Sequence, residues 1–337
     1  MNAELIEFYK SCTQCPRKCG VDRTKQGGVC GEKAELKIAS AGLHFGEEPP
    51  VTVFGGSGTI FFTGCTLRCA FCQNYQISHN GTGREVSRDE FVRICLTLQN
   101  NGAENINLVT PSHNIPLIAD ALKAAKDGGL CIPVAWNSSG YESAELLELL
   151  KGLADIYLPD FKTFDSAAGE KLFGVKDYPE RAKEAVLWML ENAPLKWTEK
   201  ECGGEKKQKL LSGVIIRHLF LPGRLDDTFK VLSWLKENAD SRALISLMSQ
   251  YTPVPFKDSP AVEQRRKKAL SSFENRLVSV QEDGDLRDLI DAFDFEYLFY
   301  QDLSDDTSWL PDFTRLQPFS NALAKPLWHY SCGFIGK

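Results

Sequence analysis

Three cysteines in the stretch GCTLRCAFCQN (residues 64–74) give the clearest chemical signal of the sequence. Cys65, Cys69 and Cys72 follow the spacing C-x3-C-x2-C, and the next cysteine is Cys95. A closed zinc site or an ordinary iron–sulfur cluster takes four protein ligands. Three thiolates on one short loop therefore predict a [4Fe–4S] cluster in which one iron has no protein ligand. Because that iron can bind a small molecule, we expect the loop to be catalytic.

A second group of cysteines lies near the start of the chain. Cys12, Cys15, Cys19 and Cys30 are spaced C-x2-C-x3-C-x10-C, and four such thiolates suit a tetrahedral zinc ion or an iron–sulfur cluster. The spacing differs from that of bacterial ferredoxins, so an electron-carrying role does not follow from it. Three interpretations stay open: a structural zinc site, an auxiliary cluster, or redox-active thiols without a metal.

The composition narrows the classes of protein. The chain has 337 residues, eleven cysteines and a formal net charge of −6. The acidic balance argues against a broad nucleic-acid-binding surface, and no apolar run reaches the roughly 18 residues that a membrane span requires. The opening residues MNAELIEFYKSC have no basic segment followed by an apolar one, as a signal peptide would. We expect a cytoplasmic protein without nucleic-acid or membrane partners.

The elements that must position the cysteine loop alternate between strand and helix. Apolar, β-branched runs predict six strands, at 59–65, 105–111, 131–140, 155–161, 213–223 and 242–251. Amphipathic runs predict the helices between them, at 87–99, 115–129, 142–152, 179–192 and 225–238. This alternation indicates βαβ units and a parallel sheet, which right-handed crossovers would curl into a partial (β/α)6 barrel. Loops at the carboxyl ends of such strands carry the chemistry, and the cysteine loop follows the first strand.

Three regions are expected along the chain. Residues 1–50 form a short cysteine-rich module, residues 51–255 form the barrel, and residues 256–337 form a C-terminal extension of helices and cover. The polar, lysine-rich stretch 191–209 is expected to be a surface insertion or loop, and 295–302 a further strand.

The cysteine loop resembles that of a known enzyme superfamily. C-x3-C-x2-C with an aromatic residue, Phe71, just before the last cysteine is similar to the signature of radical S-adenosylmethionine (SAM) enzymes. GGSGTIFFTGCTLRCAFCQN further resembles pyruvate formate-lyase activating enzymes and their less characterised homologues. Other stretches of the chain share this resemblance: CPRKCGVDR, HFGEEPP, NINLVTPSH, NSSGY, DIYLPDFK, RHLFLPG and SLMSQY. It implies a [4Fe–4S] cluster, SAM, and a one-electron donor such as flavodoxin or ferredoxin.

The resemblance also implies roles for individual residues. Asn137 to Gly140 match the Asp-Thr-Asn-Gly loop of the family, and Asp160 and Lys162 match its Asp-x-Lys pair. Arg217 matches an arginine of the fifth strand that approaches SAM. The residues expected to bind the cofactors are therefore Phe71, Asn74, Asn137, Ser138, Asp160, Lys162 and Arg217.

Several positions depart from the family pattern. Gln73 replaces a histidine, Thr110–Ser112 occupy the place of the Gly-Gly-Glu motif, Asn137 replaces an aspartate, and Tyr251 replaces a histidine. These changes argue against pyruvate formate-lyase itself as the substrate.

The sequence leaves three functions open. We favour an activase-like enzyme that abstracts hydrogen from a protein partner such as a glycyl radical enzyme. The alternatives are the same chemistry on a small molecule or another protein, and a non-catalytic iron–sulfur or zinc electron carrier. Glu47 and Glu48 are candidates for acid–base work or a solvated loop, and His113 is a candidate to face the site.

Overall fold

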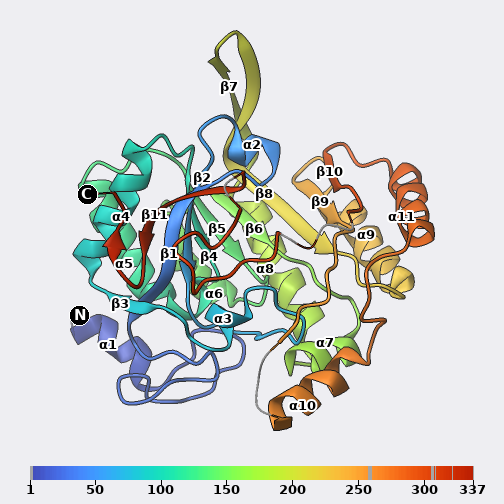
Figure 1. Cartoon of the computed structure of the whole chain (residues 1–337), viewed down its shortest axis with the longest axis horizontal. Coiled ribbons are helices and arrows are strands. Elements are labelled where there is room, and N and C mark those ends of the chain that lie inside the picture. Colours follow the sequence, from blue (N-terminus) through green and yellow to red (C-terminus); the bar gives the residue numbers. More distant parts are fainter. Residues whose placement is uncertain (1–2, 257–259, 305–306, 308, 321, 337) are drawn as a thin grey trace.

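The fold is a single mixed sheet surrounded by helices, with the cysteine-rich start of the chain packed below it (Figure 1). The computed structural model describes residues 3–256, 260–304, 307, 309–320 and 322–336. In these residues, no helix is long and apolar enough to cross a membrane.

Parallel strands form the centre of the sheet. They lie in the order β2 (Ser57–Phe62), β4 (Ile106–Val109), β5 (Val134–Ser138), β6 (Ile156–Pro159), β8 (Glu205–Leu219), β9 (Leu244–Met248) and β10 (Leu298–Gln301). The first six are the predicted barrel strands, and β10 confirms the further strand. The α/β prediction of an open, partial barrel is therefore confirmed.

Antiparallel strands extend the sheet beyond β2. These are β1 (Leu36–His44), β11 (Ala324–His329), β12 (Gly333–Phe334) and the short β3 (Arg84–Val86). Because β1 belongs to residues 1–50 and β11 to the C-terminal extension, both outer regions complete the sheet. The three-region division stays a prediction, since one continuous sheet runs through all of it.

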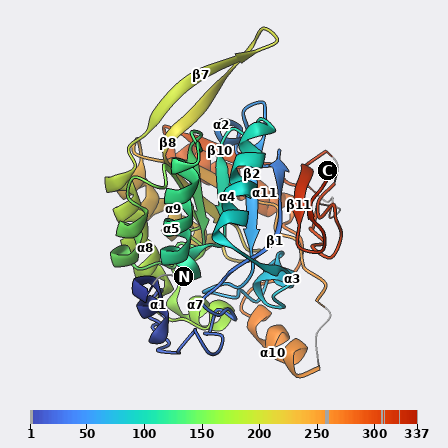
Figure 2. The same cartoon turned by 90° about the vertical axis from the view of Figure 1, so that its left-hand side faces the viewer.

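Helices cover the outer face of the parallel strands. They are α4 (Arg88–Asn100), α5 (Ile115–Asp127), α6 (Ala144–Leu147) with the turn η2 (Glu148–Leu150), α7 (Ser166–Phe173), α8 (Tyr178–Asn192), α9 (Leu225–Ala239) and α11 (Val280–Phe293). Figure 2 shows α5, α8 and α9 along one side of the molecule and β11, which extends the sheet beyond β1, toward the opposite side. Outward-facing strand residues such as Phe62, Leu108 and Trp136 pack with these helices in the largest core cluster. The apolar faces that predicted the helices are thus the faces that the sheet buries.

Shorter helices close the ends of the barrel. The turn α2 (Pro49–Thr52) lies at the amino ends of the strands, where Val51 packs with lumen residues such as Ala135 and Ile215. At the opposite end lie α3 (Tyr75–Ser78), α10 (Pro260–Leu270) and α7, together with the N-terminal helix α1 (Ala3–Lys10) and the turn η1 (Ser112–Asn114). The carboxyl ends of the strands therefore open toward the cysteine-rich region.

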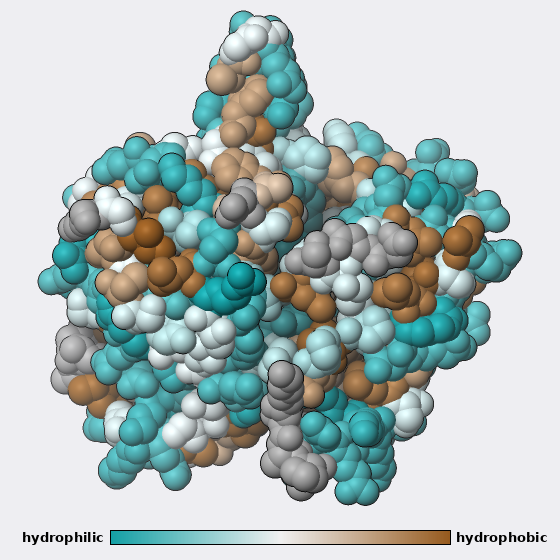
Figure 3. All heavy atoms as spheres, viewed as in Figure 1, coloured by the Kyte–Doolittle hydropathy of each residue, from teal (hydrophilic) through white to brown (hydrophobic). Residues whose placement is uncertain are grey.

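The stretch 191–209 is a surface insertion, as one of the two predicted alternatives has it, and it is not an irregular loop. The stretch is a hairpin of β7 (Lys196–Cys202) and the first half of β8, which turns at Gly203 and Gly204, both with positive φ. An ion pair joins its two strands, Lys206 to Glu199 at 2.7 Å. Lys200 and Lys209 bind Glu104 at its base, at 2.6 and 2.9 Å. The Gly-Gly pair between polar runs was the hairpin signal. The arm projects from the molecule and is flanked by hydrophilic residues (Figures 1 and 3).

Candidate active site

The cysteine loop leaves the carboxyl end of β2 and brings its three sulfur atoms into one buried region. Cys65 and Cys69 are each 7% exposed. The Leu67 and Arg68 amides donate to the Cys65 sulfur at 3.4 and 3.5 Å. The hydroxyl of Ser78 lies 3.2 Å from the Cys72 sulfur. Hydrogen bonds from N–H and O–H groups favour a charged sulfur, as in a metal thiolate.

Burial opposes ionisation of these thiols in the absence of a metal. It raises the pKa of Cys69 well above its usual value, although Lys162 acts in the opposite direction. Burial and the neighbouring Cys65 raise the pKa of Cys72 to about 11. A bound metal removes the protons of coordinating thiols. The three thiols therefore fit a cluster, whose iron ions would supply the positive charge that stabilises them as thiolates.

Lys162 and Asp160 lie beside the cysteine loop. The Lys162 ammonium donates to the Asp160 carboxylate at 2.5 Å. Burial alone would lower the pKa of Lys162, but Asp160 and Cys69 outweigh burial and raise it. The lysine is therefore a fixed positive charge between the loop and the barrel lumen. The structure thus brings together two motifs that are far apart in the sequence, CTLRC (65–69) and DFK (160–162).

Tyr178, which sequence reasoning missed, holds the Asp160–Lys162 segment in place. Its hydroxyl oxygen accepts the Lys162 amide at 2.9 Å and lies 2.9 Å from the Asp160 carbonyl and 3.0 Å from the Ser139 carbonyl. Gly140 approaches the Asp160 carbonyl so closely that an added Cβ would lie 2.5 Å from its oxygen. The tyrosine opens α8, and no sequence signal distinguishes it from an ordinary core aromatic.

Arg217 lies in the lumen and pairs with the two glutamates that precede α2. Its guanidinium binds both Glu47 and Glu48, with the Glu48 oxygens at 2.8 and 2.6 Å. Burial would raise the pKa of Glu48, but the arginine outweighs burial and lowers it. The carboxylate pair is therefore not a solvated loop: it is a buried ion-pair network. Arg217 also lies next to Asp160 across the β6–β8 bridge, which makes the charged groups continuous.

Two buried oxygen atoms near the site have no partner among the described residues. They are Oδ1 of Asn74, at the end of the cysteine loop, and Oδ1 of Asn107 on β4. The amide nitrogen of Asn107 donates to Glu47 at 3.0 Å, which places the side chain at the lumen network. An unpaired buried acceptor costs about 1–3 kcal/mol, so a bound molecule that donates to it would be stabilised.

Other predicted residues differ in orientation. Asn137 shares the lumen face of β5 with Ala135. Ser138 points to the outer face, where its hydroxyl donates to Glu142 at 2.7 Å. The Phe71 ring packs edge-on against Phe173, Tyr251 and Phe273. The Ser138 role thus stays a prediction that its orientation does not favour.

Two histidines lie outside the lumen. His113 is buried with its Nδ1 unpartnered, and burial together with Arg23 lowers its pKa to about 3. His218 hydrogen-bonds the Phe161 carbonyl and Thr228 of α9, on the side of β8 opposite Arg217, as strand alternation predicts. Thr110 adopts a positive φ of 61° in the stretch that replaces the glycine-rich motif.

Comparison with known proteins identifies the family. The model of the radical SAM superfamily matches residues 59–195, the segment that holds the cysteine loop, Asp160 and Lys162. The uncharacterized protein MJ0674 of Methanocaldococcus jannaschii is 32% identical over 267 residues, which are 77% of this chain and 71% of that protein. The chain belongs to the radical SAM superfamily. The family uses a [4Fe–4S] cluster and SAM, whose binding the buried thiols and lumen charges fit.

More distant relatives include enzymes of named function. A pyruvate formate-lyase-activating enzyme of Clostridium pasteurianum is 23% identical over 237 residues, which are 65% of this chain and 90% of that enzyme. Among solved structures, Streptococcus suis SuiB bound to S-adenosylmethionine is 14% identical with a TM-score of 0.45, covering 71% of this chain and 48% of SuiB. The chain thus spans about half the length of that structure.

As the side chains stand, no group of three or more His, Cys, Asp or Glu residues in the described ranges is arranged to hold a metal ion.

Proposed function

We propose that this radical SAM protein is an activase-like enzyme that abstracts a hydrogen atom from a protein partner, with its cluster on Cys65, Cys69 and Cys72. When bound, the cluster and SAM supply a reductive cleavage that yields methionine and a 5′-deoxyadenosyl radical. The observation that carries the proposal is the meeting of three thiols, those of Cys65 and Cys69 buried, with the Lys162–Asp160 pair at one end of the barrel.

The charges of the lumen suit SAM. Arg217 and Lys162 are two cations, and Glu47, Glu48 and Asp160 are three carboxylates in the same network. SAM carries a sulfonium, an ammonium and a carboxylate, so its net charge is positive and complements the excess carboxylate. Lys162 would hold the SAM carboxylate and Asp160 its ammonium, because each then keeps an opposite charge beside it in a buried site.

Aromatic residues would exclude water from the reacting atoms. Phe71 stands on the cysteine loop itself, and the rings of Phe173, Tyr251 and Phe273 surround it. An apolar lining that excludes water protects a reactive intermediate and strengthens the electrostatic interactions of the charged groups nearby. Asn107 and Asn137 remain as lumen amides that can bind the nucleoside or the substrate.

The activase role and its partners rest on homology. The similarity to the Clostridium pasteurianum enzyme extends over 90% of that enzyme, and an activating enzyme acts on another protein. Such chemistry needs a one-electron donor of the flavodoxin or ferredoxin class and, here, a protein substrate such as a glycyl radical enzyme.

A second candidate, a small-molecule substrate, is favoured by the C-terminal cover, residues 309–320. Phe313 is fully buried against Phe61 of β2 and Phe319. Gln76 of α3 donates to Asp312 and accepts the Phe313 amide. Residues 309–320 lie over the front of the sheet (Figure 1), and in this proposal they restrict the access of a protein loop.

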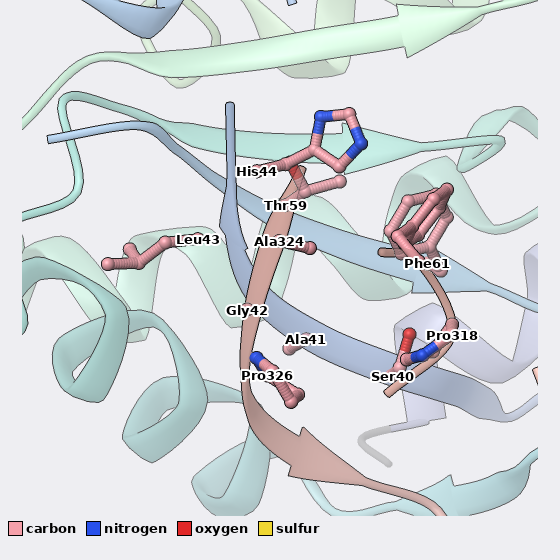
Figure 4. Close-up of a pocket in the computed structure, with 11 residues that line it drawn as sticks. Ser40, Ala41, Gly42, Leu43, His44, Thr59, Phe61, Pro318, Ala324 and Pro326 are labelled. Atoms are coloured by element: carbon pink, nitrogen blue, oxygen red, sulfur yellow. The ribbon is translucent and has the colours of Figure 1, made fainter. Parts of the chain in front are cut away.

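Figure 4 shows the pocket that this cover makes with β1 and β2. Its lining includes His44, Thr59, Phe61 and Pro318. The His44 ring packs edge-on against the Phe319 ring, with 4.9 Å between the ring centroids. A protein substrate would have to displace this contact, whereas a small molecule would not.

One anaerobic experiment tests the proposal. The reconstituted protein is reduced with dithionite, given SAM, and assayed for 5′-deoxyadenosine; the non-catalytic carrier predicts neither SAM binding nor product. Deuterated cell extract, separated into macromolecular and small-molecule fractions, is then added. Deuterium in 5′-deoxyadenosine from the macromolecular fraction supports the activase role. Deuterium from the small-molecule fraction alone overturns it in favour of the second candidate.

A further inference from the structure

Arg23 is a fully buried cation without a carboxylate partner. Its exposed fraction is 0%. It donates to the carbonyls of Glu32, Lys33 and His113 at 2.9, 2.7 and 2.5 Å, and to Asn114 Oδ1 at 2.9 Å. All these acceptors are neutral. Within the described part of the chain, no carboxylate lies within ion-pair distance of it; the nearby Glu32 carboxylate binds Thr63 and faces Lys37. A buried, uncompensated charge is strongly destabilising.

The N-terminal cysteines surround this guanidinium. Arg23 Nη1 lies 3.9 Å from the Cys12 sulfur. A Cβ placed on Gly28 would lie 3.4 Å from Arg23 Cδ, 3.4 Å from the Cys19 sulfur and 3.5 Å from the Cys30 sulfur. Cys15 belongs to the same turn of the chain, in which the Lys18 amide donates to the Cys15 carbonyl and the Gly20 amide to the Cys12 carbonyl, both at 3.0 Å. The Tyr9 ring also lies against the guanidinium, with 5.1 Å between the ring centroid and the guanidinium carbon. Thiolates at these cysteines would give Arg23 a negatively charged neighbour at close range.

A metal centre explains how these cysteines become thiolates. Four thiolates around a divalent zinc ion or a [4Fe–4S] core carry about two net negative charges. Such a centre would neutralise Arg23, whereas four protonated thiols would leave its charge uncompensated. Cys12 and Cys30 are buried, while Cys15 and Cys19 are partly exposed, so the centre would lie between solvent and the protein interior.

The cysteine-rich module also contacts the catalytic loop through its backbone. The Cys65 amide donates to the Cys30 carbonyl at 3.1 Å. One ligand of each centre is thus joined to the other by covalent bonds and a single hydrogen bond. Arg17, between Cys15 and Cys19, donates to the carbonyls of Thr66 and Leu67 of the catalytic loop. Arg68 of that loop contacts the Val29 carbonyl at 3.5 Å.

We propose that Cys12, Cys15, Cys19 and Cys30 bind an auxiliary [4Fe–4S] cluster that passes one electron to the catalytic cluster. An external low-potential donor of the flavodoxin or ferredoxin class reduces the auxiliary cluster by one electron. The auxiliary cluster is then reoxidised as the catalytic cluster goes from the 2+ to the 1+ state. The partly exposed cysteines face the donor, and the Cys30–Cys65 hydrogen bond lies on the path inward. The electron's destination rests on the proposed function, whereas the presence of the cluster does not.

The first test is independent of SAM chemistry. The variant Cys65→Ala/Cys69→Ala/Cys72→Ala is reconstituted anaerobically and analysed for iron, zinc and the electron paramagnetic resonance of the reduced protein. We expect about four irons per chain and a cluster signal on reduction. One zinc without iron, or no metal, overturns the proposal. If the variant does not fold, the wild-type protein gives the same answer: about eight irons support the auxiliary cluster, and about four irons with one zinc overturn it.

The second test addresses the relay. The rate of 5′-deoxyadenosine formation is measured with reduced flavodoxin and with dithionite, and the ratio of the two rates is compared between wild type and Cys19→Ala. We expect the ratio to fall at least tenfold, because a small reductant does not need the relay. An unchanged ratio overturns the relay. If neither protein cleaves SAM, the proposed function fails, while the metal analysis still decides the cluster.

Discussion

The two cysteine sites of this protein differ in what surrounds them. Around Cys65, Cys69 and Cys72, the barrel supplies Lys162, Asp160 and a lumen with unpaired polar atoms. Beside the four N-terminal cysteines lies Arg23 of the same region, a buried arginine that donates to backbone carbonyls. The first set has three cysteines and lies beside the charged barrel lumen, whereas the second has four cysteines and lies beside a buried arginine.

This difference teaches that the surroundings, more than the cysteines, separate the two roles. An incomplete ligand set is useful only where a substrate can reach the open position. A complete set has no such position, so it can stabilise the fold or transfer electrons. The contacts between Cys30 and Cys65 and between Arg17 and the catalytic loop show that the sites are nevertheless mechanically joined.

The largest effect that sharpens the comparison comes from Cys69→Ala. We expect loss of one cluster and of all measurable 5′-deoxyadenosine formation, with the N-terminal metal retained. Cys95→Ala is the matched control, because Cys95 is also buried but lies on α4 and belongs to neither group of cysteines. That change costs about 1 kcal/mol of packing and leaves the cluster in place. SAM cleavage by Cys69→Ala would remove the catalytic assignment.

Removing the buried cation beside each cysteine site, Lys162 or Arg23, gives the next largest effect. Lys162→Ala removes a charged hydrogen bond worth about 1.5–3 kcal/mol, so SAM affinity falls roughly tenfold to a hundredfold while iron content stays the same. Arg23→Gln is the counterpart: it lowers the metal content of the N-terminal site and leaves SAM affinity largely unchanged. Equilibrium binding measures the SAM affinity of both variants, and metal analysis measures their iron and zinc content. Equal SAM affinity in Lys162→Ala and wild type would exclude the lysine from the site.

Sequence reasoning predicted the catalytic loop and most of the barrel because those features depend on local signals. The strands are continuous apolar runs, and the cysteines, Asp160 and Lys162 follow recognisable spacing. The sequence did not predict features that depend on contacts between residues far apart in the chain. The Glu47–Glu48 pair becomes a lumen network only because Arg217, about 170 residues away, lies opposite. Tyr178 is a positioning residue because α8 packs there, and Ser138 turns outward because Glu142 accepts its hydroxyl.

Glycines beside the two sites allow a finer comparison of packing. Gly64 has a φ of +75°, and an added Cβ would lie 2.9 Å from the Cys30 carbonyl oxygen and 2.4 Å from Glu32 Cγ. We expect Gly64→Ala to lower the free energy of unfolding by about 2–4 kcal/mol, since strain and overpacking add. Gly28→Ala meets only contacts of 3.4–3.5 Å and should cost less than about 1 kcal/mol. Anaerobic urea denaturation measures both; equal values would contradict the tight contact at Gly64.

The smallest expected effect tests the junction of the two sites. Arg17 donates to the carbonyls of Thr66 and Leu67 in the catalytic loop, and to those of Phe173 and Gly174 at the end of α7. We expect Arg17→Ala to lower the free energy of unfolding by about 1–2 kcal/mol, because these bonds are partly exposed and each contributes modestly. The reduced spectra of both metal centres should shift together.

Two further variants make the Arg17 result specific. Arg88→Ala removes an exposed pair with Asp120 at 3.5 Å and should change stability by less than about 0.5 kcal/mol without altering either spectrum. Arg17→Lys keeps the charge but cannot reach several carbonyls with one planar fork, so it should recover only part of the loss. A spectral change at the N-terminal centre alone would mean that the hydrogen bond from Cys65 to Cys30, and not Arg17, carries the coupling.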